Sequence, residues 1–397
     1  MEKCPTPSAV KQSLAARIRE KGPIPFSEFM EFALYDPSWG YYIREHPTAS
    51  RNGDFITSVS VHPLFGQCLA VQIAEMAERM GTKSFQIIEF GGGKGALCVD
   101  ILKCLKEEFP RVYQRTYYRI VEVAESPSSF WEEVDRWVPE CRERLSWLTP
   151  TEWNLDSSPF SGCVLAQEFL DALPVHRVVR SRGDWEEIYV DYQKGSFKEV
   201  AGPLSSSDLR EVCQSVPEGE SLTEGAALEI NLAAVRWLEG IAARLQQGYI
   251  LILDYGAWGA PLLADTLSCY FRHTVHHNPY IRLGEQDMTT HVDFHSLVLA
   301  AQRTGLVPRG LVSQTRFLFN LGIVERASRR YDSLDSSVGL SERLALKTLT
   351  LPDGMGDRFW VFVLERSMGK ELLRGLECRV LTEGREGAQD PVLCASF

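Results

Sequence analysis

FQIIEFGGGKG, residues 85–95, is the stretch of sequence that decides the fold of this chain. Its apolar first half predicts a short buried strand, and glycines stand two, four and six positions after Glu89. Glycine lets the backbone turn sharply and approach a ligand closely. Beyond the turn, Leu97, Ile101 and Leu105 recur every four residues, which predicts a helix whose first amides are free to bind a ligand.

Two cofactors, S-adenosylmethionine and NAD, fit a glycine turn of this kind. Gly91, Gly93 and Ala96 also satisfy the looser dinucleotide pattern G-x-G-x-x-A. Glu89 favours S-adenosylmethionine, because a carboxylate suits the ammonium of the methionine moiety and repels a pyrophosphate. Glu122, which ends the next predicted strand (117–123), is placed for two ribose hydroxyls, which either cofactor would accept. A Walker-type loop is excluded, since glycine follows Lys94 where Ser or Thr is needed.

We therefore expect S-adenosylmethionine at a set of acid and glycine positions around this turn: Glu89, Gly91, Gly92, Gly93, Gly95 and Glu122. The alternative is a glycine turn that binds no ligand.

Strands and helices alternate along the rest of the chain. A helix is predicted over 25–35, with Ser27 as its cap. A second is predicted over 63–80 and stops at Gly81, and a third runs from Asn231, its cap, to Gly248. Short apolar runs predict strands over 163–166, 249–253, 316–320 and 359–364. This alternation is typical of βαβ units and a mostly parallel sheet.

Residues 175–200 break that rhythm and read as a β hairpin around residues 181–184. Residues 202–225 are polar and predict a surface loop, and the tail beyond Met368 is weakly patterned. We expect five regions: a helical cap (1–80), a Rossmann-like cofactor half (81–174), a β-containing insertion (175–230), the second half of the catalytic domain (231–368) and a tail (369–397).

The composition and net charge of the chain limit the kinds of partner that it is expected to bind. It has 397 residues and a net charge of −11, so nucleic acid is a poor partner and cationic partners are favoured. No apolar run approaches the roughly 18 residues that span a membrane. The N-terminus shows neither a secretory signal nor an Arg/Ser-rich transit peptide, which predicts a cytoplasmic protein. The 10 cysteines form no C-x-x-C pair, which indicates reduced, mostly buried thiols.

Histidines gather between His273 and His295. His291 and His295 are four apart, a spacing that binds metal on a helix, but Asp293 resembles a helix cap and leaves His291 outside that helix. We therefore expect no metal, and assign His291 to substrate binding. Asp254 and Tyr255 end the strand after the helix that begins at Asn231. We expect them to border the active-site cleft and bind the substrate; the alternative is an ordinary turn after the strand.

Several longer motifs occur in a fixed order. They are YDPSWGYY (35–42), GDFITS (53–58), the glycine loop followed by Asp100, VEV (121–123), EFLDALPVH (168–176), LDYG (253–256), DMTTHVDF (287–294) and QTRFL (314–318). With them the chain, from about Gly22 to Arg366, resembles the MidA family of class I methyltransferase-like proteins, which includes a mitochondrial complex I assembly factor.

The resemblance implies a Rossmann-like sheet, S-adenosylmethionine binding and methylation of a protein arginine. It adds Thr57 and Gln167 to the residues expected at the cofactor. Two positions depart from the family: Val59-Ser60 stand where it usually has Pro-Glu, and Gln167 stands where it has Asn. These departures leave the cofactor assignment intact and the substrate open.

Glu168 and Asp171 follow the fourth strand of the predicted sheet, at the edge where open α/β sheets gather ligands. Two carboxylates there could hold a guanidinium, orient it and stabilise charge as its proton leaves. Alternatively, Asp171 caps a turn before Pro174 and Glu168 makes a surface ion pair.

The fold class expected is α/β, a Rossmann-like class I methyltransferase sheet with an N-terminal helical cap and a β-containing insertion. Glu168 and Asp171 are the expected catalytic residues, acting on an arginine of a cationic protein substrate. Two alternatives stay open: a small-molecule methyltransferase on the same fold, and a non-catalytic assembly factor that binds the cofactor.

Overall fold

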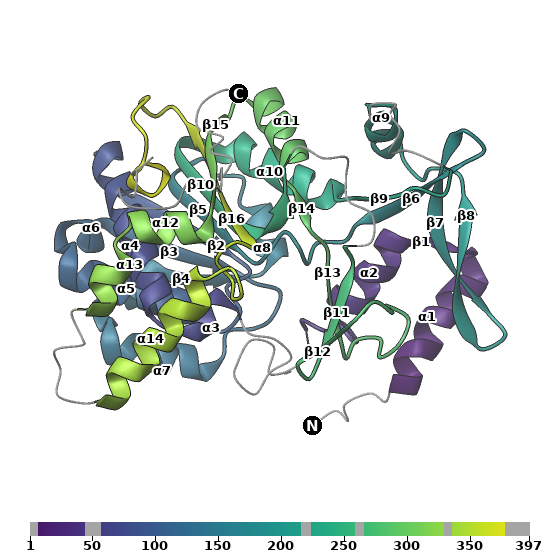
Figure 1. Cartoon of the computed structure of the whole chain (residues 1–397), viewed down its shortest axis with the longest axis horizontal. Coiled ribbons are helices and arrows are strands. Elements are labelled where there is room, and N and C mark those ends of the chain that lie inside the picture. Colours follow the sequence, from purple (N-terminus) through teal and green to yellow (C-terminus); the bar gives the residue numbers. More distant parts are fainter. Residues whose placement is uncertain (1–6, 44–56, 216–223, 259–265, 329–335, 378–397) are drawn as a thin grey trace. The chain divides into compact units, whose positions relative to one another are not determined.

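The computed structural model describes residues 7–43, 57–215, 224–258, 266–328 and 336–377 (Figure 1). The chain divides into two compact units, and each unit is built from separate stretches of sequence. Unit 1 takes Met1–Phe55, Leu170–Leu238 and Ala257–Leu297, and unit 2 takes Ile56–Phe169, Glu239–Gly256 and Val298–Phe397.

The structure therefore groups the chain differently from the five consecutive regions expected. The two helices that were predicted within the 1–80 cap belong to different units, α2 (Phe26–Tyr35) to unit 1 and α4 (Leu64–Met80) to unit 2. Helical periodicity shows which face of a helix is buried, but not which sheet that face meets.

Unit 2 contains the predicted open sheet. Its strands are β2 (Phe85–Phe90), β3 (Thr116–Val121), β4 (Leu145–Leu148), β5 (Phe160–Gln167), β10 (Leu245–Ala257), β15 (Val307–Ser313) and β16 (Phe359–Arg366). They lie in the order β15-β16-β10-β5-β2-β3-β4. The pairs from β10 to β4 are parallel, whereas β16 is antiparallel to both of its neighbours. The expected mostly parallel, Rossmann-like sheet is confirmed.

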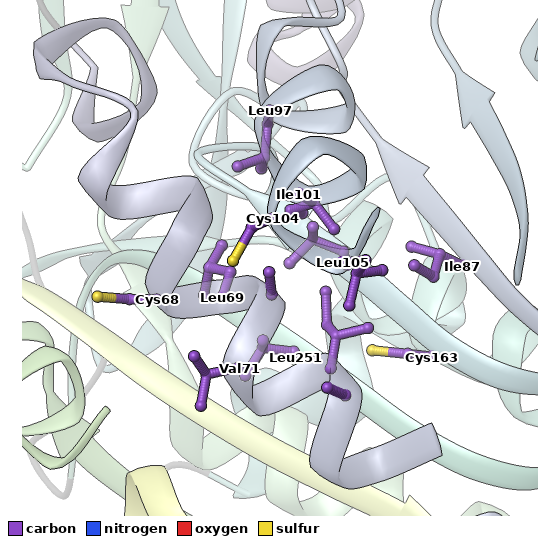
Figure 2. Close-up of a cluster of buried hydrophobic side chains, with 14 of the residues drawn as sticks. Cys68, Leu69, Val71, Ile87, Leu97, Ile101, Cys104, Leu105, Cys163 and Leu251 are labelled. Atoms are coloured by element: carbon purple, nitrogen blue, oxygen red, sulfur yellow. The ribbon is translucent and has the colours of Figure 1, made fainter. Parts of the chain in front are cut away.

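The core of unit 2 joins helices α4 and α5 (Ala96–Glu108) to this sheet. Figure 2 shows part of this cluster: Cys68, Leu69 and Val71 come from α4, and Leu97, Ile101, Cys104 and Leu105 from α5. Ile87, Cys163 and Leu251 reach it from three neighbouring strands. The four-residue repeat after the glycine turn is thus the buried face of α5, as predicted.

Most of the other helices of unit 2 are short, and α14 is the longest of them. They are α3 (Ser58–Val61), α6 (Pro110–Arg115), α7 (Ser128–Trp137), η1 (Pro139–Arg144), α8 (Pro150–Leu155), α12 (Gln314–Asn320), α13 (Ile323–Ser328), α14 (Ser336–Thr350) and η2 (Arg374–Leu376).

Unit 1 is built on two small antiparallel sheets. The first has the order β1-β7-β6-β9 with β8 on β7, from β1 (Ile24–Pro25), β6 (His176–Ser181), β7 (Asp184–Gln193), β8 (Ser196–Gly202) and β9 (Ala227–Ile230). The second joins β11 (Ser268–Phe271), β12 (Thr274–His276) and β13 (Asp287–Thr289). The predicted hairpin is confirmed as β6 and β7. Helices α1 (Pro7–Lys21), α2 and α9 (Ser207–Ser215) complete the unit.

Three further elements lie near boundaries between the stretches. They are α10 (Leu232–Arg244), β14 (Val292–Asp293) and α11 (Phe294–Thr304). Asn231 caps α10 as predicted, since its Oδ1 accepts a hydrogen bond of 2.8 Å from the amide of Ala234.

Four local predictions were wrong. Residues 316–320 lie in helix α12 rather than a strand, because a short apolar run has no period of its own and Ser313 caps a helix here. Helix α9 occupies part of the predicted 202–225 loop. Helix α10 ends at Arg244, and Gly248 lies in β10. Ser27 lies inside α2 and does not cap it; its hydroxyl contacts His176 Nδ1 at 3.3 Å.

The described cysteines are free and buried, as expected: Cys68, Cys98, Cys104, Cys141, Cys163, Cys213 and Cys269. In the part of the chain that the structure describes, no helix has the length and apolarity to cross a membrane. The motif positions 53–56 and the tail from residue 378 lie outside the described residues.

Candidate active site

The glycine loop between β2 and α5 depends on glycine at several positions. Gly91, Gly93 and Gly95 have φ angles of +71°, +55° and +77°, a left-handed region that side chains rarely adopt. A Cβ at Gly95 would lie 2.3 Å from the Phe130 ring. At Gly93, in contrast, a Cβ would meet nothing within 4 Å. Gly95 thus allows close packing, whereas Gly93 borders open space of the kind a cofactor needs.

Glu89 lies at the end of β2 and is only 2% exposed. Its Oε2 accepts a hydrogen bond of 2.7 Å from the hydroxyl of Tyr118 on β3. Burial raises the pKa of Glu89 to about 7, although the Tyr118 hydrogen bond opposes that rise. A cation beside Glu89 would therefore hold it ionised, which fits the ammonium predicted there.

Glu122 lies beside the same loop, because β2 and β3 are parallel and in register up to Phe90 and Val121. Its two carboxylate oxygens accept hydrogen bonds of 2.8 Å from the amides of Gly93 and Val123. Burial raises the pKa of Glu122, and these backbone hydrogen bonds oppose the rise. The structure thus brings both predicted acids and the glycines to one edge of the sheet, and the residues fit S-adenosylmethionine.

Glu168 follows β5, the strand that pairs with β2 on its other side. Its Oε1 accepts two hydrogen bonds, one of 3.0 Å from the amide of Ser58 and one of 2.7 Å from Gln167 Nε2. Its backbone is left-handed, with a φ of +49°, which costs a non-glycine residue roughly 1–2 kcal/mol. The structure around Glu168 therefore holds this side chain in a fixed direction against local strain.

Gln167 itself is 6% exposed, and its Oε1 has no hydrogen-bond partner among the described residues. A buried acceptor of this kind is costly unless something donates to it. The unpartnered Oε1 of Gln167, at the end of the strand next to β2, is consistent with the predicted contact to the cofactor.

Asp254 and Tyr255, predicted to bind the substrate, lie near the end of β10 and make contacts within unit 2. Asp254 is fully buried, and its carboxylate accepts hydrogen bonds from the amides of Phe169 and Tyr255, at 3.2 and 2.8 Å. The Tyr255 ring packs on Phe359 with centroids 4.0 Å apart. These contacts position the backbone just after Glu168.

Thr57 begins helix α3 with a capping box. Its hydroxyl accepts from the Ser60 amide at 3.1 Å, and Ser60 Oγ accepts from the Thr57 amide at 2.9 Å. Ser58 donates its hydroxyl to Gln314 Oε1 at 3.1 Å and its amide to Glu168. Thr57 thus contributes by fixing the helix start that presents the Ser58 amide.

Sequence reasoning missed three of these contributors: Tyr118, the Ser58 amide and Gln314. Ser58 and Gln314 stand inside motifs that were noticed, but no spacing rule pairs residues 256 positions apart. Tyr118 is signalled only by its place on the strand next to Glu89.

Asp171 and His291 belong to unit 1. Asp171 is 4% exposed, and its carbonyl accepts a hydrogen bond of 2.9 Å from the Thr290 amide. Burial and the charges of Asp287 and Asp171 raise the pKa of Tyr42, whose hydroxyl donates to Asp287 at 2.7 Å. The His291 amide donates to Thr266 Oγ1 at 2.9 Å.

The histidine pair matches the sequence argument. Asp293 caps α11, since its Oδ1 accepts from the His295 amide at 3.0 Å, and His291 precedes the helix. Among the described residues, no group of three or more His, Cys, Asp or Glu side chains is arranged to hold a metal ion.

An open sheet of this order, with an acid–glycine loop after its first strand and a second acid after the next, defines a class I S-adenosylmethionine-dependent methyltransferase. The sequence profile of one such family, described as S-adenosyl-L-methionine-dependent methyltransferases, matches residues 68–312, and the chain belongs to this family. The resemblance to the MidA family is thereby confirmed.

Solved structures and curated proteins are similar over most of their lengths. A Burkholderia thailandensis protein described as a "likely methyl transferase", crystallised with S-adenosyl-homocysteine, is 29% identical, with a TM-score of 0.81 over 93% of this chain and 95% of that one. The Drosophila melanogaster protein named "Protein arginine methyltransferase NDUFAF7 homolog, mitochondrial" is 30% identical over 88% of this chain and 83% of its own. The human NDUFAF7 protein is 28% identical over 88% and 82%.

These findings settle the cofactor, since a relative with the same fold binds the demethylated product of S-adenosylmethionine. They also correct the expected location. The curated relatives are mitochondrial proteins, so the prediction of a cytoplasmic protein was wrong. It rested on the composition of the first residues alone.

Proposed function

We propose that this chain methylates an arginine side chain of a protein, and that Glu168 binds the guanidinium of that acceptor. The observation that carries the proposal is the double anchoring of Glu168 Oε1 by Ser58 and Gln167 at the edge of the sheet that also holds the glycine loop. The names of the curated relatives support a protein arginine as the acceptor.

The bound cofactor would supply an electrophilic methyl group on a sulfonium, with Glu89, Gly93 and Glu122 as the residues that hold it. Glu168 supplies direction and charge. A guanidinium is protonated at neutral pH and donates in a fixed fork, so a carboxylate in one orientation aligns it. As the new N–C bond forms, the methyl–sulfur bond would break and one N–H proton must leave to water, and the carboxylate stabilises the positive charge of the guanidinium until it does.

Asp171 is proposed as the second carboxylate. It follows Glu168 by three residues, and its side chain is almost fully buried. The acidic net charge of −11 would also attract a basic protein partner.

The test is a comparison of three proteins in a whole-cell lysate with labelled S-adenosylmethionine: wild type, Glu168→Gln and Glu107→Gln. Glu107 is exposed on α5 and serves as the matched charge control. We expect methyl-arginine in protein with wild type and with Glu107→Gln, and a loss of roughly 10²–10⁴-fold with Glu168→Gln at unchanged cofactor affinity.

Three results would contradict the proposal. Label in a neutral small molecule would favour the small-molecule methyltransferase. Full activity of Glu168→Gln would remove Glu168 from the mechanism. Tight cofactor binding with no label transferred to anything would favour a non-catalytic assembly factor.

A further inference from the structure

Residues 268–284, which form the β11–β12 hairpin and the segment that follows it, carry positive charge on an acidic chain (Figure 1). They include two arginines and three histidines but no aspartate or glutamate, whereas the whole chain has a net charge of −11. We call them the basic hairpin. The methyl-transfer mechanism uses none of these residues, although most of the histidines that gather between His273 and His295 lie here.

Both arginines of the basic hairpin lie against one aromatic ring, that of Phe271 at the end of β11. The guanidinium of Arg272 is 5.1 Å from the ring centroid, and that of Arg282 is 4.5 Å from it. Both residues are exposed, and within the described part of the chain Arg282 makes no ion pair. Stacking engages the face of a guanidinium, whereas a carboxylate binds its N–H edge, so an anion can bind while both arginines stay stacked.

Positive charge also acts on His276, the last residue of β12. Burial lowers the pKa of His276, and the charges of Arg282 and His277 lower it further. Because both of these charges are cationic, they indicate a positive potential on this part of the sheet. A positive potential of this kind attracts carboxylates.

The conformation of the hairpin turn is strained for the residues that occupy it. Arg272 and His273 are its central pair, between the paired residues Phe271 and Thr274, and have φ angles of +45° and +62°. Turns of this type favour Asn-Gly, because both central residues need a positive φ. Such strain is typical of functional sites, and here it points to a role for the exposed arginine and histidine side chains.

Hydrogen bonds hold the segment after β12 in place. The Asn278 amide donates to His276 Nδ1 at 3.2 Å, and the Tyr280 amide donates to Asn278 Oδ1 at 3.0 Å. The carbonyl of Asn278 accepts a hydrogen bond of 3.1 Å from Gln286 Nε2. Arg282 is thus presented from an ordered backbone, which reduces the entropy lost when a partner binds.

We propose that the basic hairpin binds an acidic segment of a partner protein, one that carries both carboxylates and aliphatic side chains. Arg272 and Arg282 pair with the carboxylates. Val275 and Ile281, which are 57% and 40% exposed, contact the aliphatic side chains. The inference goes beyond the proposed function and does not depend on it, because the methylated residue is a cation whereas this surface selects anions.

Two other occupants fit the same surface less well. Binding to an anionic bilayer typically uses clusters of roughly four to eight basic residues, and the basic hairpin has two arginines. A symmetric dimer formed through this surface would place the arginines of one copy against those of the other, and like charges across an interface repel.

The experiment measures the binding of labelled peptides to the full chain by fluorescence anisotropy. The probe is a short peptide of alternating glutamate and valine, and the control peptide has glutamine in place of glutamate. We expect the glutamate peptide to bind wild type at least about tenfold more tightly, and the double variant Arg272→Gln with Arg282→Gln to weaken it about tenfold or more. Arg210→Gln is the matched control variant, since Arg210 is exposed on α9 in the same unit, and it should bind like wild type.

Binding of S-adenosyl-homocysteine shows which variants are folded, and Arg282→Gln alone makes the same test if the double variant is not. Equal binding of the two peptides, or an equal loss in Arg210→Gln, would overturn the inference. Vesicles of phosphatidylcholine and phosphatidylserine test the membrane, and sedimentation velocity tests the second copy. Vesicle binding or dimer formation that needs Arg272 and Arg282 would assign the surface to that occupant and overturn the inference as well.

Discussion

Two glutamates end neighbouring parallel strands of unit 2 and are held in opposite ways. Glu89 at the end of β2 is buried, has one hydroxyl donor from Tyr118 and has a pKa raised to about 7. Glu168 after β5 is partly exposed, has two donors on one oxygen and sits on a strained backbone. The first arrangement tunes a charge, whereas the second fixes a direction. A carboxylate that binds a permanent cation needs the former, and one that aligns a reacting group needs the latter.

The largest effect that bears on this comparison is expected at the glycine loop. Gly93→Val should abolish cofactor binding, a loss of at least about 100-fold, because the valine side chain fills the open space next to Glu122. Gly195→Val is the matched control, since Gly195 also has a positive φ, +85°, and open space around it, but lies in the β7–β8 turn. Calorimetry with S-adenosyl-homocysteine measures both. Equal losses in the two variants would assign the effect to backbone strain.

The next effect tests whether Gln167 gives Glu168 its direction. Gln167→Ala removes the 2.7 Å donor from Glu168 Oε1 and should lower kcat roughly 10- to 100-fold with the cofactor affinity little changed. Single-turnover methylation and calorimetry separate the two quantities. If Gln167→Ala instead weakened cofactor binding and left kcat unchanged, Gln167 would act through its Oε1 on the cofactor.

A smaller effect follows from the charge of Glu89. Because its pKa is about 7, the ionised form gains population as pH rises, so cofactor affinity should increase about five- to tenfold between pH 6 and 7.5. Glu89→Gln should make the affinity weak and flat over this range. Tyr118→Phe removes a hydrogen bond that lowers this pKa, so the rise should move to higher pH. An unchanged midpoint in Tyr118→Phe would contradict this account.

The pKa of Glu89 also predicts a pH dependence of stability. The folded state holds this proton up to about pH 7, whereas the unfolded chain releases it near pH 4.5. The contribution of Glu89 to the free energy of unfolding is therefore full below about 4.5 and is lost as pH rises toward 7. Urea denaturation of wild type against Glu89→Gln should show this difference, and a bound cofactor should reduce it.

The smallest effect compares two capping boxes. Thr57→Ala and Thr149→Ala each remove an N-cap that bonds the amide three residues on, so each should lower the free energy of unfolding by about 1 kcal/mol. Only Thr57→Ala should also lower kcat, because the neighbouring Ser58 amide holds Glu168. If both variants kept full kcat, the Ser58 contact would be structural alone.

The backbone of the candidate cofactor site could be predicted from the sequence. Strand β2, the glycine turn and helix α5 are adjacent in the chain, so period and residue type determine them locally. The end of the next strand placed Glu122 at the same edge, because parallel strands bring their carboxyl ends together. Residues whose position is set by local backbone geometry could be predicted for this reason.

The acceptor half could not be derived in the same way. The donors that orient Glu168 include the amide of Ser58, 110 residues earlier in the chain, and a backbone amide leaves no mark in the residue type. The left-handed φ of Glu168 likewise cannot be predicted from the sequence, because glutamate is not one of the residue types that favour this conformation. The helix over residues 314–320 was missed because a short apolar run fits either period.

Strand β16, near the end of the described chain, lies between β10 and β15. Both partners are synthesised earlier, so during synthesis β10 presents an open edge of unpaired backbone amides and carbonyls until residue 366 has emerged. Such an edge invites pairing with other chains while it waits. A ribosome that stalls before this point would release a chain with an open, apolar sheet edge, and a chaperone that covers β10 would be most useful in that interval.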